Sequence, residues 1–549
     1  MSSQINHPLR NEKEITEITS TSNTSYSNLS SSSDSFLIPL SATSTNRGAR
    51  NFSRNKFSRF LGYVDEKYQI SLRGSTFTCE ILGGILMFLC SLYTLRLQPM
   101  DLVNDDLDLS TCVTTASLLT GLATVSMSVA NFPIVLSVSL TGSTFFKNVL
   151  MKQYKYDYST SCTIILLASL ASFALPFLLR KNFLKSIPAK FRIGIGFGIG
   201  LLIGRIAFQY MFGNSDQIIS KTSFNRVDVV VSMLVSSFTL LLIIYLLLRW
   251  RYRENYASIN NTYLSYLNSL STPLSNTQKR NSFLSGSNGI VIAYAIPTVL
   301  SLIAILVINL ARKKLVIRDW YFPSLKKIAF KKNFNGLDRD CWFLVPLISA
   351  NQFCDSVATV LIIIQMAFLD EIEYDQSKFI SVLNKGSFSK FQMIVFATVV
   401  WSIISSIFGS TMIVPLIESI TGLVVGCRTG LSTLVTGICF FIVLFCPPII
   451  DLVQPVSTAP LLLLTCVISM SMIKNLQYKN IQEIIPYVAT LLVIPLSSSI
   501  SFGSIYGYSF FFLFLLFAPN SGYKKITKSM ILIFVFCIAT ICFQYVSGS

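Results

Sequence analysis

The chain of 549 residues contains little that could support acid–base or metal chemistry. Its one histidine, His7, stands in a polar tail, so a histidine-based catalytic or zinc site is excluded. The twelve cysteines are scattered, mostly inside apolar stretches, and no C-x-x-C pair occurs. We therefore interpret the cysteines as small core hydrophobes, and we expect no disulfide framework, metal site or cofactor.

Charge is scarce too, since 13% of the residues are charged and 52% are hydrophobic. The apolar residues form repeated blocks that are long enough to cross about 30 Å of hydrocarbon as helices. The sequence therefore predicts an all-α polytopic membrane protein. Fourteen spans are expected, near 76–98, 112–131, 133–151, 160–179, 193–213, 228–249, 289–311, 342–368, 390–408, 411–426, 429–449, 458–474, 484–518 (broken around Ser501 to Gly503) and 529–547.

The formal net charge of +18 is concentrated in the tail and the loops. Residues 1–60 are rich in Ser, Thr and Asn and lack the apolar region of a signal peptide, so we expect a disordered cytosolic tail over 1–70. The basic loops 180–192 and 249–256 then lie on the cytosolic side, whereas loop 312–341, with nine Lys or Arg, falls on the opposite side. This charge favours anionic lipid headgroups over nucleic acid as a partner.

Two carboxylates stand inside predicted spans. Glu418 lies in the middle of the apolar stretch 409–432, where an isolated acid costs several kcal/mol, so a chain that keeps one there usually uses it. Asp355 lies in the eighth span, on a polar helix face that a spacing of three and four residues creates. Packing against other polar helices would explain the serines and threonine of that face but not readily an acid. The face consists of Ser349, Gln352, Asp355, Ser356 and Thr359.

The third span alternates small polar residues with others, which fits an extended strand better than a helix. Non-helical backbone within a membrane is tolerated where protein buries it or where it lines a polar cavity. Pro133 and Pro415 also disfavour continuous helices. We therefore predict that residues 137–143 and 410–416 are short extended segments that cross near the midplane, each leading into a half-helix. The alternating residues are Ser137, Ser139, Thr141 and Ser143.

The motif P-x-x-E-S-x-x-G-x-x-x-G-x-R-T-G-L-S at 415–432 resembles the adenine/guanine/hypoxanthine permeases, the AzgA-like branch of the xanthine/uracil permease superfamily. NQFCDSVATVL (351–361) is similar to the family's acidic eighth-span motif, with Gln352 in place of its first Asp. ANFPIVLSVSLTGSTFF (130–146) is similar to its third-span motif, but Ser139 and Thr141 replace two glycines and Ser143 replaces an asparagine. RGSTFTCEILGGILMFLCSLYTLRLQP (73–99) resembles the opening motif and retains Glu80. The likeness runs from about 70 to 520.

The resemblance implies two inverted seven-span repeats in a transporter domain over 71–547, at about 71–311 and 342–547, joined by the basic loop 312–341. Spans 1–4 and 8–11 would form a core that moves against a gate of spans 5–7 and 12–14. A weak internal match, VSLTGS (138–143) with ESITGL (418–423), agrees with such a repeat. Broken elements that meet near the midplane are common in transporters of this kind.

The function that the resemblance implies is proton-coupled symport of purine nucleobases across the plasma membrane, with a homodimer through the gate as one arrangement. The substrate-binding residues would be Glu418, Gln352, Asp355, Ser143, Thr141 and Ser139, and the proton-coupling residues Glu418 and Asp355. Two alternatives stay open. A changed substrate such as an anion is suggested by the replaced motif residues and by Arg96 and Arg205, although such arginines also snorkel to the interface. The other alternative is a membrane receptor or scaffold without transport.

Overall fold

The computed structural model describes residues 56–103, 107–178, 189–212, 332–367, 390–445, 455–470, 481–497, 499–517 and 528–548, with a few isolated positions between them. The contacts reported below lie within the compact unit Arg59–Ser549. The predicted spans at 228–249 and 289–311 and most of loop 312–341 lie outside the described residues.

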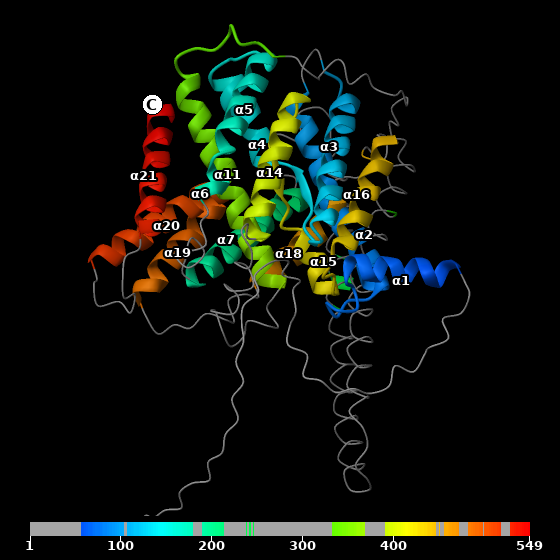
Figure 1. Cartoon of the computed structure of the whole chain (residues 1–549). Coiled ribbons are helices and arrows are strands. Elements are labelled where there is room, and N and C mark those ends of the chain that lie inside the picture. Colours follow the sequence, from blue (N-terminus) through cyan, green and yellow to red (C-terminus); the bar gives the residue numbers. More distant parts are fainter. Residues whose placement is uncertain are drawn as a thin grey trace, which may run out of the picture. The chain divides into compact units, whose positions relative to one another are not determined.

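The described elements are helices, apart from two short strands (Figure 1). Those before residue 213 are α1 (Lys56–Tyr68), α2 (Phe77–Leu102), α3 (Leu109–Val129), β1 (Leu136–Val138), α4 (Leu140–Phe145), the π-helix η1 (Phe146–Gln153), α5 (Tyr158–Ser172), α6 (Leu175–Leu178) and α7 (Ala189–Phe212). Those after residue 340 are α11 (Cys341–Ala367), α14 (Lys390–Ile407), β2 (Ile413–Pro415), α15 (Ser419–Val425), α16 (Gly430–Phe445), α18 (Pro455–Met470), α19 (Ile481–Ser497), α20 (Ile500–Phe517) and α21 (Lys528–Gly548).

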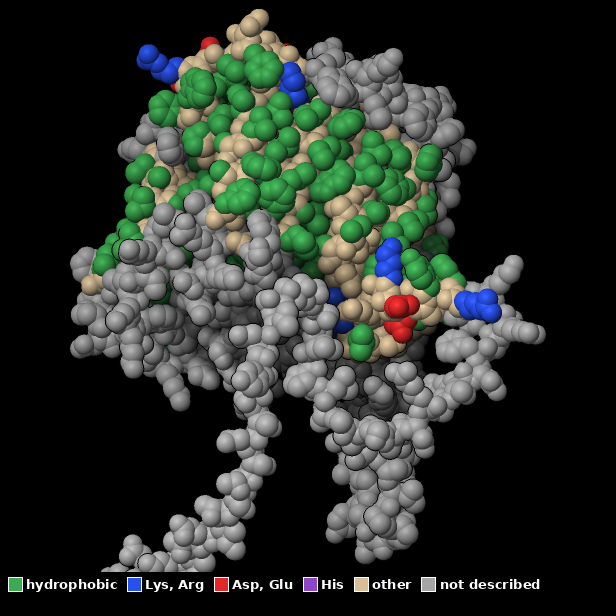
Figure 2. Space-filling model, viewed as in Figure 1, with side chains coloured by type: hydrophobic (Ala, Val, Ile, Leu, Met, Phe, Trp, Pro, Cys, Tyr) green, Lys and Arg blue, Asp and Glu red, His purple; other side chains and the backbone are tan. Residues whose placement is uncertain are grey.

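The helices have the apolar character of membrane spans. Within the described residues, four are long and apolar enough to cross a bilayer, namely Phe77–Leu102, Leu109–Val129, Tyr158–Phe177 and Cys341–Ile364, and shorter apolar helices accompany them. Figure 2 shows a broad band of hydrophobic side chains on the described face, with the visible charged side chains above and below it. This distribution matches a protein whose middle is surrounded by lipid.

The two extended segments are present where the sequence predicts them. β1 and β2 pair antiparallel, with Ser137 opposite Val414. Backbone bonds continue the pairing on both sides, from Ser139 N to the Met412 carbonyl at 2.8 Å and from Leu416 N to the Val135 carbonyl at 2.9 Å. Each strand leads into a short helix, α4 or α15. The prediction of broken third and tenth segments is therefore confirmed, and the antiparallel relation of the two units is the one that an inverted repeat requires.

The extended part of the third segment is shorter than the predicted 137–143. α4 begins at Leu140 because Ser139 is its N-cap, and the Ser139 hydroxyl accepts a hydrogen bond from Gly142 N at 3.0 Å. A serine cap of this kind satisfies an amide that the first helical turn would leave unpaired. Polar alternation continues into the helix, so the sequence pattern alone could not show where the strand ends.

The helices fall into two packing groups. α2, α3, α5, α11, α14, α15 and α16 pack mainly with one another, and α7 packs with α18, α19 and α20. Each group combines elements from both halves of the chain, as the interleaved core and gate of the predicted fold require. Fewer contacts join the groups, and those of α11 with α20 and α21 are among them.

Two boundaries differ from the sequence analysis. The thirteenth span is two helices, α19 and α20, and the break falls between Ser497 and Ile500 instead of around Ser501 to Gly503. Gly503 is a packing position, since a Cβ there would lie 3.0 Å from the Ile494 Cα on α19. At the other end of the chain, the expected tail 1–70 contains α1, whose last residue Tyr68 is buried.

Candidate functional site

Glu418 lies in the turn between β2 and α15 and is buried. Its Oε1 accepts a hydrogen bond of 2.5 Å from the Tyr93 hydroxyl on α2, whereas Oε2 has no hydrogen-bond partner among the described residues. Neighbouring side chains hold this turn, because the Ser419 hydroxyl accepts from Val135 N at 3.0 Å and the Thr421 hydroxyl donates to the Glu418 carbonyl at 2.6 Å. A fixed, buried carboxylate therefore has one oxygen available to a donor.

Gln352 on α11 is connected to the other end of β2. Its Nε2 donates to the Ser402 hydroxyl on α14 at 2.6 Å, and the same hydroxyl accepts from Ile413 N at 2.9 Å. The Gln352 Oε1 is buried without a hydrogen-bond partner among the described residues. The structure thus anchors Gln352 and Glu418 at opposite ends of one short strand, each with an acceptor oxygen that is not engaged.

Asp355 is on the same helix but has a partner in the other packing group. It is buried, and its Oδ1 accepts a hydrogen bond of 2.6 Å from the Ser501 hydroxyl on α20. Ser501 also donates to the Asn351 carbonyl at 3.2 Å. The bond therefore joins α11 to α20, across the contact between the two groups of helices.

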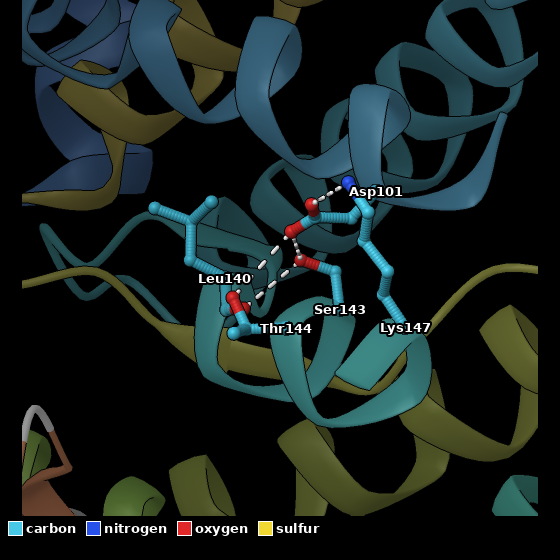
Figure 3. A network of polar contacts seen from close by, with 5 residues as sticks. All are labelled: Asp101, Leu140, Ser143, Thr144 and Lys147. Atoms are coloured by element: carbon cyan, nitrogen blue, oxygen red, sulfur yellow. Dashed lines mark hydrogen bonds and ion pairs between the residues drawn. The ribbon is translucent and has the colours of Figure 1, made fainter. Parts of the chain in front are cut away.

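The three third-segment candidates belong to the entry into α4. Ser139 is the cap of that helix, and Thr141 is half-buried in its first turn. Ser143 donates to Asp101 Oδ2 at 3.2 Å, and Lys147 forms an ion pair with Asp101 Oδ1 at 3.0 Å (Figure 3). Thr144 donates to the same carboxylate at 3.4 Å. These bonds fasten α4 and η1 to the last turn of α2.

Two residues that the sequence analysis did not propose contribute polar groups here. Tyr93 holds Glu418, and Gln98 Nε2 donates to the Ser410 and Thr411 hydroxyls at 3.2 and 3.4 Å, just before β2. The Gln98 Oε1 is buried without a partner among the described residues. Tyr93 is a tyrosine in an apolar span, where no local sequence pattern marks it as part of a site.

Other polar residues of the motifs have structural partners. Glu80 accepts hydrogen bonds from Arg428 N, Thr429 N and Ser432 N at 2.8, 3.1 and 3.3 Å, so its carboxylate caps the start of α16. The Arg428 guanidinium donates to the Leu423 carbonyl at 3.0 Å, at the end of α15. Arg96 donates to the Ile450 carbonyl at 3.0 Å, and the exposed Arg205 donates to the Pro495 carbonyl at 2.5 Å.

Comparisons with known proteins find permeases among the relatives of this chain. No family model matches the chain. The adenine permease AdeQ of Escherichia coli is 23% identical over 464 residues, which cover 83% of this chain and 92% of that protein. The adenine permease AdeP of the same bacterium is 22% identical over 81% of this chain and 89% of its own length. The nucleobase transporter PlAzg2 of Paenibacillus larvae is 30% identical over 129 residues, 24% of this chain and 26% of that protein.

Among solved structures, the transmembrane domain of the cyanobacterial bicarbonate transporter BicA aligns over 78% of this chain and 97% of its own, with 11% identity and a TM-score of 0.46. The apolar helices, together with the buried polar side chains around β1 and β2, are those of a polytopic membrane transporter. The relatives named above are permeases and not enzymes. Within that class, the chain is similar to nucleobase permeases, and its likeness to the two adenine permeases extends over most of its length.

Proposed function

We propose that the protein is a proton-coupled symporter of purine nucleobases such as adenine, guanine and hypoxanthine. The observation that carries the proposal is the buried Glu418 Oε2, which has no hydrogen-bond partner among the described residues. A purine presents N–H donors along its edges, and a carboxylate oxygen and an amide oxygen can each accept from such a donor. The names of AdeQ and AdeP support adenine as a substrate.

The proposed site is built around β2. Glu418 would accept from the nucleobase, and Gln352 would complete recognition with its free Oε1. Asp355 would contribute from the same helix, and Thr141, Ser139 and Ser143 would border the site from α4. Gln98, which also has a free buried oxygen, is a further candidate. Each of these side chains stands on a helix or next to one of the paired strands β1 and β2. The backbone hydrogen bonds between the strands would hold the proposed site in place before the substrate binds.

Proton coupling would use Glu418 and Asp355. A buried carboxylate without a full set of partners is costly as an ion, so loading and proton uptake are expected to be linked. Asp355 is suited to this role because its hydrogen bond to Ser501 joins the two helix groups that would move against each other. Protonation of Asp355 would change that bond and thereby the contact between α11 and α20.

Radiolabelled uptake into cells that lack their own nucleobase transporters tests the function. We expect adenine and hypoxanthine to accumulate, uracil and sulfate to remain outside, and a protonophore to abolish accumulation. Accumulation of sulfate instead would favour the anion alternative, and no uptake of any solute by protein that reaches the surface would favour a receptor. Uptake that a protonophore does not affect would remove the proton from the proposal.

We also propose a plasma-membrane location, a cytosolic N-terminus and a homodimer through the gate helices. The tail carries three glycosylation sequons, at Asn23, Asn28 and Asn51, which would stay unmodified in the cytosol. A glycan at any of them would reverse the topology. Mass photometry of the purified protein distinguishes a dimer from a monomer.

A further inference from the structure

α1 exposes a face that no described part of the protein covers. Phe60 and Tyr63 are 60% and 64% exposed, and Lys67 is exposed as well. These residues follow one another at spacings of three and four, which places them along one side of the helix. A different side is buried, since Tyr68 at the end of α1 packs with Ile70 and Leu431. The helix therefore has one face toward the protein and a second, aromatic and basic face toward its surroundings.

α1 is held at a fixed place by bonds at its C-terminal end. Asp65 accepts from the Ser71 backbone and hydroxyl at 2.8 and 2.6 Å, and these hydrogen bonds lower the pKa of the Asp65 carboxyl. Arg73 donates to the Asn131 and Arg428 carbonyls at 2.9 and 3.0 Å, and the Asn131 side chain donates to the Tyr68 carbonyl at 3.0 Å. The helix is thus tied to the chain just before β1 and just after α15.

These bonds also fix the level of α1 relative to the membrane spans. α2 is a membrane span that begins at Phe77, nine residues after α1 ends, so α1 lies where a span leaves the apolar band. Figure 1 shows α1 running across the direction of α2 and α3. A helix in this orientation, at this level, lies in the plane of a membrane surface if its outer face suits one.

We propose that α1 is an interfacial helix that lays its Phe60–Tyr63–Lys67 face on an anionic lipid surface. Aromatic side chains with polar neighbours are favoured at the level of the headgroups. Basic residues are attracted to anionic lipid there, and the sequence from 47 to 59 adds five of them without an acid: Arg47, Arg50, Arg54, Lys56 and Arg59. Of the two acids of α1, Asp65 is engaged by Ser71, and Glu66 lies beyond Tyr63 at the edge of the face, about 120° around the helix from Phe60.

Added tryptophans measure where this face lies. Phe60→Trp and Tyr63→Trp replace one aromatic ring by another, and Glu66→Trp is the matched control on the same helix. The full-length protein would be placed in lipid nanodiscs with and without bromine on the upper acyl chain, and the emission of the unsubstituted protein, which has four tryptophans, would be subtracted. We expect the tryptophans at 60 and 63 to lose most of their emission to bromine, and the one at 66 to keep most of it.

A water-soluble quencher measures the opposite property, namely how far each tryptophan is exposed to water. Iodide should quench the tryptophan at 66 more strongly than those at 60 and 63. Equal quenching by iodide at all three positions would show that the aromatic face lies in water, and the proposal would be wrong. Monodisperse elution of each variant confirms that its fold is retained.

A second experiment varies the charge of the lipid headgroups. We expect bromine quenching of Phe60→Trp to increase when phosphatidylserine replaces part of the phosphatidylcholine, and this increase to be lost when Lys67→Glu and Arg59→Glu are added. Quenching that is strong but independent of phosphatidylserine would overturn the anionic part of the proposal.

Discussion

At Glu418 the two oxygens of one carboxylate have different surroundings, since Tyr93 donates to Oε1 and Oε2 has no partner among the described residues. Glu418→Gln keeps the size of the side chain but replaces one acceptor with a donor. We expect a loss of about 1–3 kcal/mol in substrate binding, or about ten- to a hundredfold in affinity, and nearly complete loss of purine uptake. Glu66→Gln, on the exposed surface of α1, is the control. Normal uptake by Glu418→Gln at equal surface abundance would exclude Glu418 from the site.

Tyr93→Phe tests whether Tyr93 positions that carboxylate. Removal of the hydroxyl leaves Glu418 Oε1 without its donor, so we expect an increase in the KM for purine uptake of about five- to tenfold, corresponding to about 1 kcal/mol for one hydrogen bond. The double variant with Glu418→Gln should be no worse than Glu418→Gln alone, because the bond is already altered there. Additive losses in kinetic uptake assays would mean that Tyr93 acts independently of Glu418.

Individual residues differ in how much of their role the sequence reveals. Glu418 and Asp355 stood out because an acid at membrane depth needs a reason. Ser139 and Ser143 stood out because polar residues alternate there, but the Ser139 hydroxyl caps a helix and the Ser143 hydroxyl donates to Asp101. In a sequence, a small hydroxyl residue with such a structural role looks the same as one that lines a pocket. The role of Tyr93 depends on a partner 325 residues away, which no local pattern encodes.

At the scale of elements, the pairing of β1 with β2 joins the two halves of the chain, with Ser137 opposite Val414. The two extended segments were predictable from the prolines and the polar alternation. The turn at 417–418 between β2 and α15 was not, because it depends on hydrogen bonds such as the one that Ser419 accepts from Val135 N.

Glycines in these spans permit close contacts between elements, and Gly84 on α2 gives a direct test. A Cβ there would lie 2.5 Å from the Ser432 carbonyl oxygen and 2.9 Å from the Val435 Cβ, so α2 and α16 would have to separate. We expect Gly84→Ala to lower the free energy of unfolding by about 1–3 kcal/mol, visible as a lower Tm of the purified protein in detergent.

The matched control is Gly62→Ala in α1, where a Cβ would meet no atom within 4 Å. Alanine favours helix over glycine by about 1 kcal/mol, so the Tm should stay constant or increase slightly. If both variants changed the Tm equally, helix propensity and not the approach of α2 to α16 would explain the result. The same logic explains why the break at Ser501 to Gly503 was placed wrongly, since a glycine in a span can serve packing as well as a break.

At the scale of the whole molecule, the helices divide into two groups that both halves of the chain build together. Periodicity and length located most of the spans, but the packing of the helices depends on contacts between residues far apart in sequence, such as the pairing of β1 with β2. The end of the expected tail was misjudged for a related reason. Tyr68 and Ile70 are ordinary residues of a short segment until Leu431 and Asn131 provide their partners.

Two truncations separate the tail from α1. Deletion of residues 2–55 leaves α1, the hydrogen bonds that Asp65 accepts and those that Arg73 donates, so we expect an unchanged KM for purine uptake, measured at equal surface abundance. Deletion of 2–75 also removes Tyr68, Ile70 and Arg73, and it leaves the Asn131 and Arg428 carbonyls without the guanidinium that bridges them. Because unpaired, partly buried carbonyls cost about 1–3 kcal/mol each, this second truncation should lower the Tm of the purified protein. Equal Tm values for the two truncations would show that α1 contributes nothing to the fold, whereas an altered KM after the first would place the tail in the transport cycle.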